Sequence, residues 1–358
     1  MSLRIIVIGT GGVGAHALRA VLGNPGYDLT GVWVSSEEKA GKDAGELAGL
    51  DWATGVLATT DLGALLETTP DCAVYTAIAD TRMLEALDDY RQILAAGVNV
   101  VGTGGTFLQF PWGVVPDELF APLEVAATAN GASLFVNGID PGFANDIVPL
   151  ALAGTCQSVE QIRCIEICDY STYDSALIMR DLMGFGRPLE DIPMVLSPGA
   201  LSMAWGSVIR LGAKWLDVEL DEITERSVRV PAPDSFDTAW GHIAEGTAAA
   251  LRFEVAGMVE GRSVIVAEHV TRMRDDLCPQ WPRPATGSYT YRIEITGEPS
   301  YAMDFNLSSR NGDHAHAGMV ATASRVVNSI PAVVAAPPGI VTTLDLPLPS
   351  GKGLFRCP

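Results

Sequence analysis

The residues LRIIVIGTGGVG, Leu3–Gly14, decide the fold of this 358-residue chain. The β-branched run Leu3–Ile8 is typical of a buried parallel strand, and the glycines that follow have the spacing G-x-G-x-x-G. An apolar stripe then predicts a helix over Val13–Leu22, which the turn residues 23–26 end. A strand, this glycine pattern and a helix in direct succession are the context in which the pattern binds a dinucleotide.

Each glycine of the pattern has a physical reason. Gly9 permits the tight turn, Gly11 lets a pyrophosphate approach the backbone, and Gly14 lets the helix pack close to the strand. The helix N-terminus supplies free N–H groups for the phosphates. We therefore expect the whole turn to bind the cofactor: Gly9, Thr10, Gly11, Gly12, Val13 and Gly14. The alternative is a glycine-rich turn that binds nothing.

Strands and helices alternate over the first ~140 residues, which predicts an α/β fold with a doubly wound parallel Rossmann sheet. The six predicted strands are, in order, Leu3–Ile8, Asp28–Val34, Val56–Ala58, Cys72–Tyr75, Val98–Val101 and Ala132–Val136. Asp61 is expected to cap a short helix that ends at Leu66. The pattern changes after Pro141-Gly142. A long strand is expected over Ser158–Tyr170. A hairpin is predicted from the strands Thr247–Ala256 and Ser263–Thr271, which are joined around Glu260-Gly261. Long strands joined by hairpins indicate a second, α+β domain with a mostly antiparallel sheet.

The end of the second strand bears on the choice of cofactor. An acidic residue there would hold the ribose of NAD, whereas this chain has Ser35, Ser36 and Lys39, which suit the 2′-phosphate of NADP. We expect NADP, with NAD as the alternative if Glu37 or Glu38 turns toward the ribose. These charged residues could also be a solvated helix start.

Small residues end the fourth and fifth predicted strands, namely Thr76-Ala77 and Gly102-Thr103. Ligands of such sheets bind at the carboxyl ends of the strands, so we expect these four residues along the cofactor. The alternative is that they are ordinary loop residues.

The composition limits the class of partner. The chain has 43 Asp+Glu and 23 Lys+Arg, a formal charge of −20, and 48% hydrophobic residues. Nucleic acid is not expected as a partner, because it requires clustered positive charge. Neither a signal peptide nor a membrane span is predicted. Six scattered cysteines without a CxxC pair indicate a cytoplasmic protein with reduced thiols.

Together with the glycine turn, several further segments resemble the dihydrodipicolinate-reductase-like NAD(P)-dependent oxidoreductases, in particular the branch of 2,4-diaminopentanoate dehydrogenase and native amine dehydrogenases. The segments that carry this resemblance are Gly9–Gly14, Ala40–Leu47, Asn99–Val101, Asn137–Phe143, Tyr173–Ser175, Gly184–Gly186 and Val327–Val333. The resemblance implies a Rossmann domain over residues 1–142 with a C-terminal return over 310–358. It also implies a substrate and dimerisation domain over 143–309, and a homodimer. The implied reaction is hydride transfer to or from a C=N or C=O bond of a small molecule.

The sequence departs from this group in two places. True dihydrodipicolinate reductases carry a stretch His-His-x-x-Lys-x-Asp-Ala-Pro-Ser-Gly-Thr, which is absent here, so that activity is not expected. Amine dehydrogenases of the branch have a catalytic Glu soon after the fifth strand, whereas residues 102–112 contain no carboxylate. An NADP-binding regulatory protein without catalysis is therefore the alternative function.

Three residues are candidates for proton transfer in place of that Glu. Asp140 is the first, as a general acid or base in the loop after the sixth strand; alternatively it caps a helix that begins near Phe143. Glu166 lies in the long strand and is the second, unless it lies on the solvent face of the sheet. Tyr173 could donate a phenolic proton, with packing as the alternative role.

Aromatic residues after the fifth strand indicate an apolar substrate, because no lysine or arginine cluster accompanies them. The expected pocket residues are Thr106, Phe107, Gln109, Phe110, Trp112 and Phe143. The alternative is packing between domains. No metal site is expected, because Cys164 and Cys168 have strand spacing and no nearby histidine.

Overall fold

The structure, a computed structural model, describes residues 2–310, 312–349 and 351–355. The chain forms two compact units. The first consists of Met1–Ile139 and Met319–Pro358, and the second of Asp140–Gly318. The second unit is therefore one uninterrupted segment inserted between two parts of the first.

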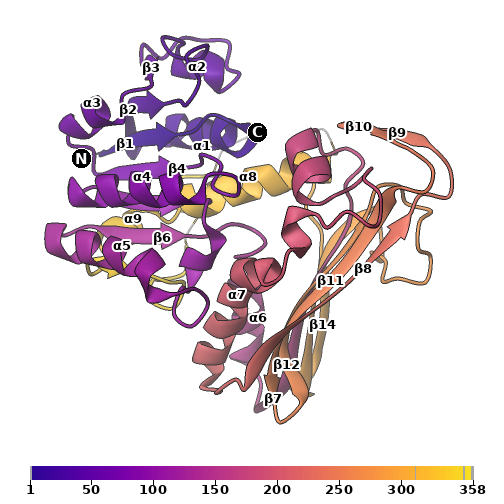
Figure 1. Cartoon of the computed structure of the whole chain (residues 1–358). Coiled ribbons are helices and arrows are strands. Elements are labelled where there is room, and N and C mark those ends of the chain that lie inside the picture. Colours follow the sequence, from indigo (N-terminus) through magenta and orange to yellow (C-terminus); the bar gives the residue numbers. More distant parts are fainter. Residues whose placement is uncertain (1, 311, 350, 356–358) are drawn as a thin grey trace. The chain divides into compact units, whose positions relative to one another are not determined.

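The first unit contains a seven-stranded, fully parallel sheet of order β15-β6-β5-β4-β1-β2-β3 (Figure 1). Its strands are β1 (Leu3–Ile8), β2 (Tyr27–Trp33), β3 (Ala58–Thr59), β4 (Cys72–Tyr75), β5 (Asn99–Gly102), β6 (Ser133–Val136) and β15 (Gly339–Ile340). The order of β1 to β6 is that of the dinucleotide-binding fold. The predicted doubly wound sheet is confirmed.

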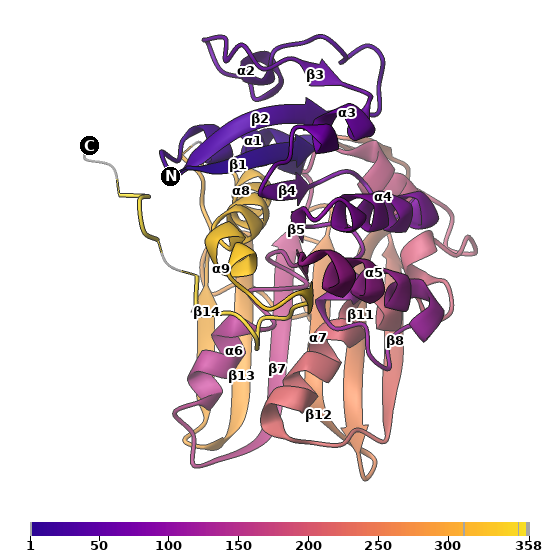
Figure 2. The same ribbon diagram turned by 90° about the vertical axis from the view of Figure 1, so that its left-hand side faces the viewer.

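Helices cover both faces of this sheet. They are α1 (Gly12–Leu22), α2 (Ala44–Leu47), α3 (Leu62–Glu67), α4 (Met83–Ala95), α5 (Asp117–Asn130), α8 (His314–Val327) and α9 (Ile330–Val334), with a 3-10 turn η1 (Thr106–Gln109). On one face, Leu18 of α1 packs with Val327 of α8, Ile330 of α9 and the strand residues Ile5 and Val7. Helices α4 and α5 lie side by side on the opposite face (Figure 2).

The stretch His314–Val334, which joins α8 and α9, is long and apolar enough to cross a membrane by length and composition. Ala323, Val326 and Val333 of this stretch are fully buried in the core of the first unit. A core helix passes the same test of length and composition.

The second unit contains a six-stranded mixed sheet of order β14-β13-β7-β12-β11-β8. Its strands are β7 (Ser158–Asp169), β8 (Glu222–Pro231), β11 (Ala248–Val259), β12 (Arg262–Arg272), β13 (Tyr289–Glu298) and β14 (Tyr301–Phe305); β9 (Phe236–Thr238) and β10 (Gly241–Ile243) form a separate hairpin. Only β7 and β12 are parallel neighbours within this sheet. The predicted, mostly antiparallel sheet is therefore confirmed.

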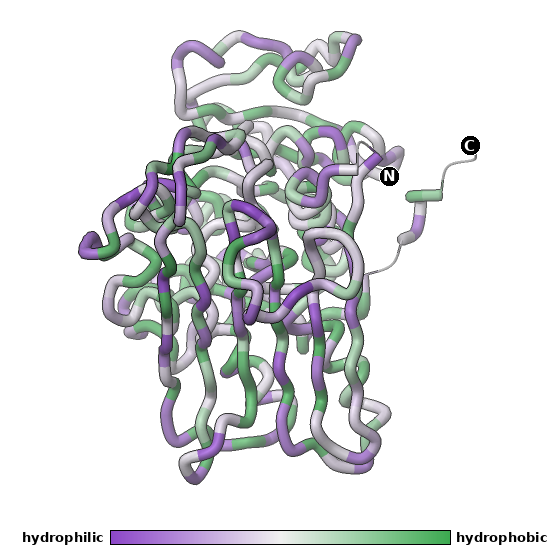
Figure 3. The backbone as a smooth tube through the Cα atoms, turned by 90° about the vertical axis from the view of Figure 1, so that its right-hand side faces the viewer, coloured by the Kyte–Doolittle hydropathy of each residue, from purple (hydrophilic) through white to green (hydrophobic). Residues whose placement is uncertain are grey.

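Helices α6 (Ile147–Ala153) and α7 (Ala200–Leu216) cover one face of this sheet (Figure 2). The unit also contains a π-helix, Leu177–Leu182, and a 3-10 turn, Met194–Leu196. Hydrophilic and hydrophobic residues alternate along the long strands (Figure 3), as expected for strands whose two faces differ. A Cβ at Gly257 of β11 would lie 2.8 Å from Cγ2 of Ile209, so glycine allows α7 to pack closely here.

Candidate functional site

The glycine-rich turn has the geometry that the sequence predicts. Gly9 adopts φ +90°, and a Cβ there would lie 2.6 Å from the backbone nitrogen of Ala77. A Cβ at Gly14 would lie 2.2 Å from the carbonyl oxygen of Gly9. A Cβ at Gly11, in contrast, has no described atom within 4 Å. Gly9 and Gly14 therefore allow close packing, whereas Gly11 leaves open space for a phosphate.

The N-terminus of α1 fits an anionic ligand. Its N-cap is Gly11, and no side chain of the described residues caps the helix. The first hydrogen bond within the helix runs from the N–H of Ala15 to the carbonyl of Gly11. The preceding N–H groups have no partner within the helix and can bind a phosphate. The turn thus fits the pyrophosphate of a nicotinamide dinucleotide.

The lysine after β2 lies against this turn. Nζ of Lys39 donates to the carbonyl oxygen of Thr10 at 3.2 Å and to its hydroxyl at 3.3 Å. Ser36 is half-buried, and Glu37 and Glu38 are exposed. Lys39 and the glycine turn are therefore brought together, whereas the other serine candidate, Ser35, is exposed.

The four small residues at the ends of β4 and β5 lie at the same edge of the sheet. The hydroxyl of Thr76 donates to the carbonyls of Ile8 and Gly9, both at 3.0 Å, and so holds the glycine turn. Ala77 lies against Gly9, as described above. The N–H of Thr103 donates to the carbonyl of Tyr75, and Gly102 pairs with Val136 of β6.

The expected pocket residues divide between the two units. Phe107 and Gln109 are buried in η1, Thr106 and Phe110 are half-buried, and the side chain of Trp112 is 39% exposed. The ring of Trp112 meets the ring of Phe110 edge-on at 5.1 Å and that of Phe120 at 6.0 Å. This aromatic group belongs to the first unit.

Phe143 belongs to the second unit and is half-buried. The contribution of all six residues to a substrate pocket stays a prediction.

Two of the three proton-transfer candidates are joined by a histidine. Nε2 of His269 lies 3.1 Å from Oδ1 of Asp140, and Nδ1 of the same ring lies 2.9 Å from Oε2 of Glu166. The three side chains are at most 6% exposed. All belong to the second unit. Asp140, His269 and Glu166 form a continuous buried chain, which we call the carboxylate–histidine cluster.

Strand register explains how the sequence builds this cluster. Glu166 of β7 pairs with His269 of the parallel strand β12 on one side and with Tyr291 of β13 on the other. His269 pairs in turn with Phe253 of β11. Residues paired across a sheet point to the same face. One row of side chains therefore crosses four strands, and Asp140 approaches it from the loop after β6.

Aromatic side chains hold the imidazole in place. The ring of His269 stacks on Phe253 at 4.5 Å and meets Trp205 of α7 edge-on at 4.7 Å. Nε1 of Trp205 also donates to Oδ1 of Asp140 at 2.8 Å. Burial lowers the pKa of His269, but the carboxylates of Asp140 and Glu166 outweigh it and raise this pKa to about 10. The ring is therefore an imidazolium at neutral pH.

Three phenols bind the second oxygen of Glu166. Oε1 accepts from the hydroxyls of Tyr170 at 3.0 Å, Tyr291 at 3.1 Å and Tyr289 at 3.4 Å. Burial raises the pKa of each phenol well above its usual value, and the Glu166 carboxylate adds to this effect. The third candidate, Tyr173, packs its ring edge-on against Tyr170 at 5.6 Å.

The structure overturns the two non-catalytic readings of these carboxylates. Asp140 does not cap a helix near Phe143, because α6 begins at Ile147 and its cap is Asp146. Glu166 does not lie on a solvent face, because it is only 4% exposed. A buried Glu is unusual because burial of a carboxylate is costly, but four hydrogen-bond donors to Glu166 compensate this cost.

The sequence interpretation missed His269 and Trp205. The alternation along β12 places His269 on the same face as Ile265 and Ala267. This apolar pattern could have predicted that His269 points into the core. Its pairing with Glu166 depends on the register of strands that lie about a hundred residues apart, which local pattern does not encode.

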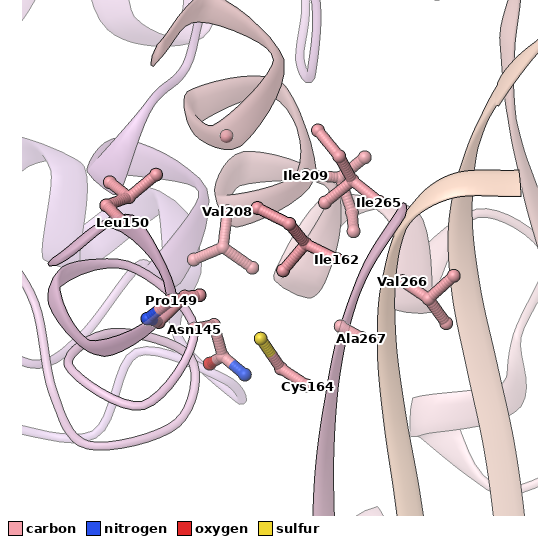
Figure 4. Close-up of a pocket in the computed structure, with 11 residues that line it drawn as sticks. Asn145, Pro149, Leu150, Ile162, Cys164, Val208, Ile209, Ile265, Val266 and Ala267 are labelled. Atoms are coloured by element: carbon pink, nitrogen blue, oxygen red, sulfur yellow. The ribbon is translucent and has the colours of Figure 1, made fainter. Parts of the chain in front are cut away.

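A small cavity lies close to this cluster but is too small for a substrate. It measures about 10 Å³ and is lined mainly by apolar residues of α6, α7, β7 and β12 (Figure 4). Asn145 and Cys164 also line it. Such a volume holds about one water molecule. Among the residues that the structure describes, no group of three or more His, Cys, Asp or Glu could hold a metal ion.

Comparison with known proteins identifies the family. Residues 143–353 match the model of the 2,4-diaminopentanoate dehydrogenase C-terminal domain. The chain is 40% identical over 345 residues to an amine dehydrogenase of Streptomyces virginiae, covering 96% of each chain. It is 23% identical over 360 residues to the 2,4-diaminopentanoate dehydrogenase of Acetoanaerobium sticklandii, covering 99% of this chain and 96% of that one.

Solved structures agree at the level of the fold. The amine dehydrogenase from Mycobacterium smegmatis superposes with a TM-score of 0.79 at 23% identity and covers 99% of both chains. GenD2 from gentamicin A biosynthesis, solved in complex with NAD, superposes with a TM-score of 0.53 at 16% identity, covering 92% of this chain and 86% of that one. The chain belongs to the family of amine dehydrogenases and 2,4-diaminopentanoate dehydrogenases, and it is an NAD(P)-dependent oxidoreductase.

Proposed function

We propose that this enzyme interconverts a small apolar ketone and the corresponding amine with NADP(H), and that Asp140 transfers the proton. The observation that carries the proposal is the carboxylate–histidine cluster. It supplies a buried carboxylate in a chain that lacks the Glu expected after β5. The 40% identity to an amine dehydrogenase supports the C=N reaction over reduction of a ketone alone.

The position of Asp140 along the chain supports this role. Asp140 follows the last residue of β6, Val136, by four residues. A four-residue segment spans at most ~14 Å. Ligands of doubly wound sheets bind beyond the carboxyl ends of the strands, and the length of this segment allows Asp140 to reach that region.

The chemistry requires one group that both accepts and returns a proton. In the direction of amine formation, Asp140 accepts a proton from ammonium, and the resulting ammonia adds to the carbonyl carbon. Asp140 then donates this proton to the hydroxyl of the carbinolamine, the C–O bond breaks, and water and an iminium are formed. A nicotinamide dinucleotide held at the glycine turn would supply the hydride for the iminium carbon. The proton on Asp140 is thus regained and released once in each turnover.

The preference for NADP rests on Lys39. Its ammonium group lies at the glycine turn through two bonds to Thr10, and the two acidic residues beside it are exposed. Dissociation constants for NADPH and NADH measure the preference directly. Tighter binding of NADH would contradict it.

A substrate panel tests the reaction. We expect NADPH to be consumed with apolar ketones plus ammonia, faster than with cyclic imines or with ketones alone. Faster turnover of ketones without ammonia would instead indicate a carbonyl reductase. Binding of NADPH without turnover of any substrate would indicate an NADP-binding regulatory protein.

A single isosteric substitution tests Asp140. Asp140→Asn keeps both bonds to Oδ1 but cannot take up the proton. We expect the rate of amine formation to fall roughly 10²–10⁴-fold. The affinity for NADPH should stay unchanged. A rate within a few-fold of the parent enzyme would remove Asp140 from the mechanism.

We further propose that the protein is a cytoplasmic homodimer whose residues 143–309 carry the substrate and dimer contacts. The five cysteines within the described residues are all free thiols, which fits a reducing compartment. Light scattering coupled to size-exclusion chromatography measures the oligomeric state. A monomeric mass would contradict the dimer.

A further inference from the structure

The two oxygens of the Asp140 carboxylate are bound differently. Oδ1 accepts two N–H donors, Nε1 of Trp205 at 2.8 Å and Nε2 of His269 at 3.1 Å. Oδ2 accepts only Nδ2 of Asn145 within the described residues, at 3.2 Å. The two donors to Oδ1 occupy both of its lone pairs. A proton that arrives at Asp140 therefore has its place on Oδ2.

The orientation of Asn145 strengthens this distinction. Its amide oxygen accepts the N–H of Gly142 at 3.2 Å, and therefore its amide nitrogen faces Asp140 as a donor. All three groups bound to Asp140 are thus donors. They occupy both lone pairs of Oδ1 and leave one lone pair on Oδ2.

His269 in turn is fixed from both ends. Its two nitrogens are bound to different carboxylates, and its ring is stacked on Phe253 and packed against Trp205. Rotation of the ring would break both bonds at once. Glu166 is held in its own place by the three tyrosines, which restrict it from the far side.

The charges around His269 come from few groups. Among the described residues, Asp140 and Glu166 are the charged partners of its ring. The phenols behind Glu166 and the buried thiols of Cys164 and Cys168 on the same strand stay neutral, because burial raises the pKa of each of them. The cluster therefore contains two carboxylates and one imidazolium, and removal of the imidazolium leaves two buried anions without a cation.

We propose that His269 is a positioning residue for this reaction: with Trp205 it holds Oδ1 of Asp140, so that proton exchange with the substrate takes place at Oδ2. This proposal rests on the proposed function of Asp140. When the carbinolamine loses water, the O–H bond at Oδ2 breaks and a new O–H bond forms on the departing oxygen. His269 keeps both of its protons throughout and does not touch the substrate.

Two substitutions test this role. His269→Gln removes the double donor, and Glu166→Gln keeps the imidazole but replaces one of its two carboxylate partners by an isosteric neutral group. His242→Gln is the matched control, because His242 is 58% exposed and pairs with Asp237 at the surface. For each variant we would measure kcat, the KM of the ketone, the pH dependence of kcat, the dissociation constant of NADPH and the melting temperature.

A positioning role predicts a specific pattern. We expect His269→Gln to lower kcat roughly 10- to 100-fold, the cost typical of a misplaced reacting group. The KM of the ketone and the dissociation constant of NADPH should stay within about threefold of the values of the parent enzyme, a much smaller change than that in kcat. Glu166→Gln should fold, lower kcat less, and shift the pH at which kcat falls. The control should match the parent enzyme in all measurements.

Other results would overturn the proposal. If His269→Gln and Glu166→Gln lower the melting temperature but leave kcat and its pH profile unchanged, then the histidine is only structural. If His269→Gln does not fold, Glu166→Gln decides alone, by the presence or absence of the shifted pH profile. Asp140→Asn separates the two proposals: full activity of that variant refutes the proposed function of Asp140, whereas its loss together with an active His269→Gln refutes only the positioning role.

Discussion

At the scale of single residues, the protonation of His269 links the cluster to stability. A buried imidazolium between two carboxylates stabilises the folded protein only while it keeps its proton. Its pKa rises from 6.5 to about 10 on folding. The stabilisation is therefore complete below pH 6.5, declines as the pH rises above that value, and is lost above about 10.

The raised pKa of His269 predicts that the stability of the folded protein depends on pH. We expect the free energy of unfolding to fall with rising pH between those two values, with a slope of up to about 1.4 kcal/mol per pH unit for one proton. The double variant His269→Gln/Glu166→Gln is the reference, because it removes the cation together with one anion. Urea denaturation at several pH values would measure the difference. Equal slopes in parent and variant would contradict a raised pKa for His269.

Lys39 is the second residue with a direct test. Lys39→Ala removes the ammonium group next to Thr10. A charge-assisted hydrogen bond contributes about 1.5–3 kcal/mol, so we expect the affinity for NADPH to fall roughly 10- to 100-fold. The affinity for NADH should not change. Lys42→Ala is the control, because Lys42 forms an exposed pair with Glu46, and a similar loss in both variants would contradict the role of Lys39.

At the scale of elements, two glycines of the strand–turn–helix unit have different roles: Gly14 allows the helix to pack, and Gly11 leaves space for the cofactor. Gly14→Ala places a Cβ about where the carbonyl of Gly9 lies, 2.2 Å away, and should lower both the melting temperature and NADPH binding. Gly11→Ala places its Cβ in open space. This variant should keep the melting temperature and still lose affinity, because the methyl group occupies the position of the pyrophosphate. Retained affinity in Gly11→Ala would show that the phosphate binds elsewhere.

Elements whose pattern is local were predictable from the sequence. The strand β4 has the predicted bounds Cys72–Tyr75, and Asp61 caps α3 as predicted by accepting the N–H of Ala64. The β11–β12 hairpin turns at Glu260 and Gly261, as predicted; both have positive φ values, which the residue type at Gly261 allows. In each case the signal lies within a few residues.

Elements that depend on distant contacts were not predictable in this way. The strand β8 (Glu222–Pro231) was missed, because its side chains are mostly exposed or half-buried and give no apolar stripe. The same limit hid the carboxylate–histidine cluster. Asp140 and Glu166 were selected from their places in the sequence, but the histidine between them becomes visible only when β7 and β12 are paired.

At the scale of the whole molecule, the first unit is built from two segments that lie on either side of the second unit along the chain. The first unit takes its last strand, β15, from beyond the second unit, and β15 pairs with β6. The helix α9 likewise contributes Ile330 and Val333 to the core of that unit. We expect a chain truncated after Gly318 to lose NADPH binding and to show an incomplete first unit by hydrogen exchange, whereas a truncated chain that binds normally would contradict this.

The insertion also has a consequence for synthesis. A ribosome completes the continuous second unit before it has made α9 and β15, which the first unit needs. The nucleotide-binding sheet therefore receives its edge strand β15 only after the second unit has been translated. During that interval β6 is an unprotected sheet edge, so the sheet that binds the cofactor is completed after the unit that interrupts it.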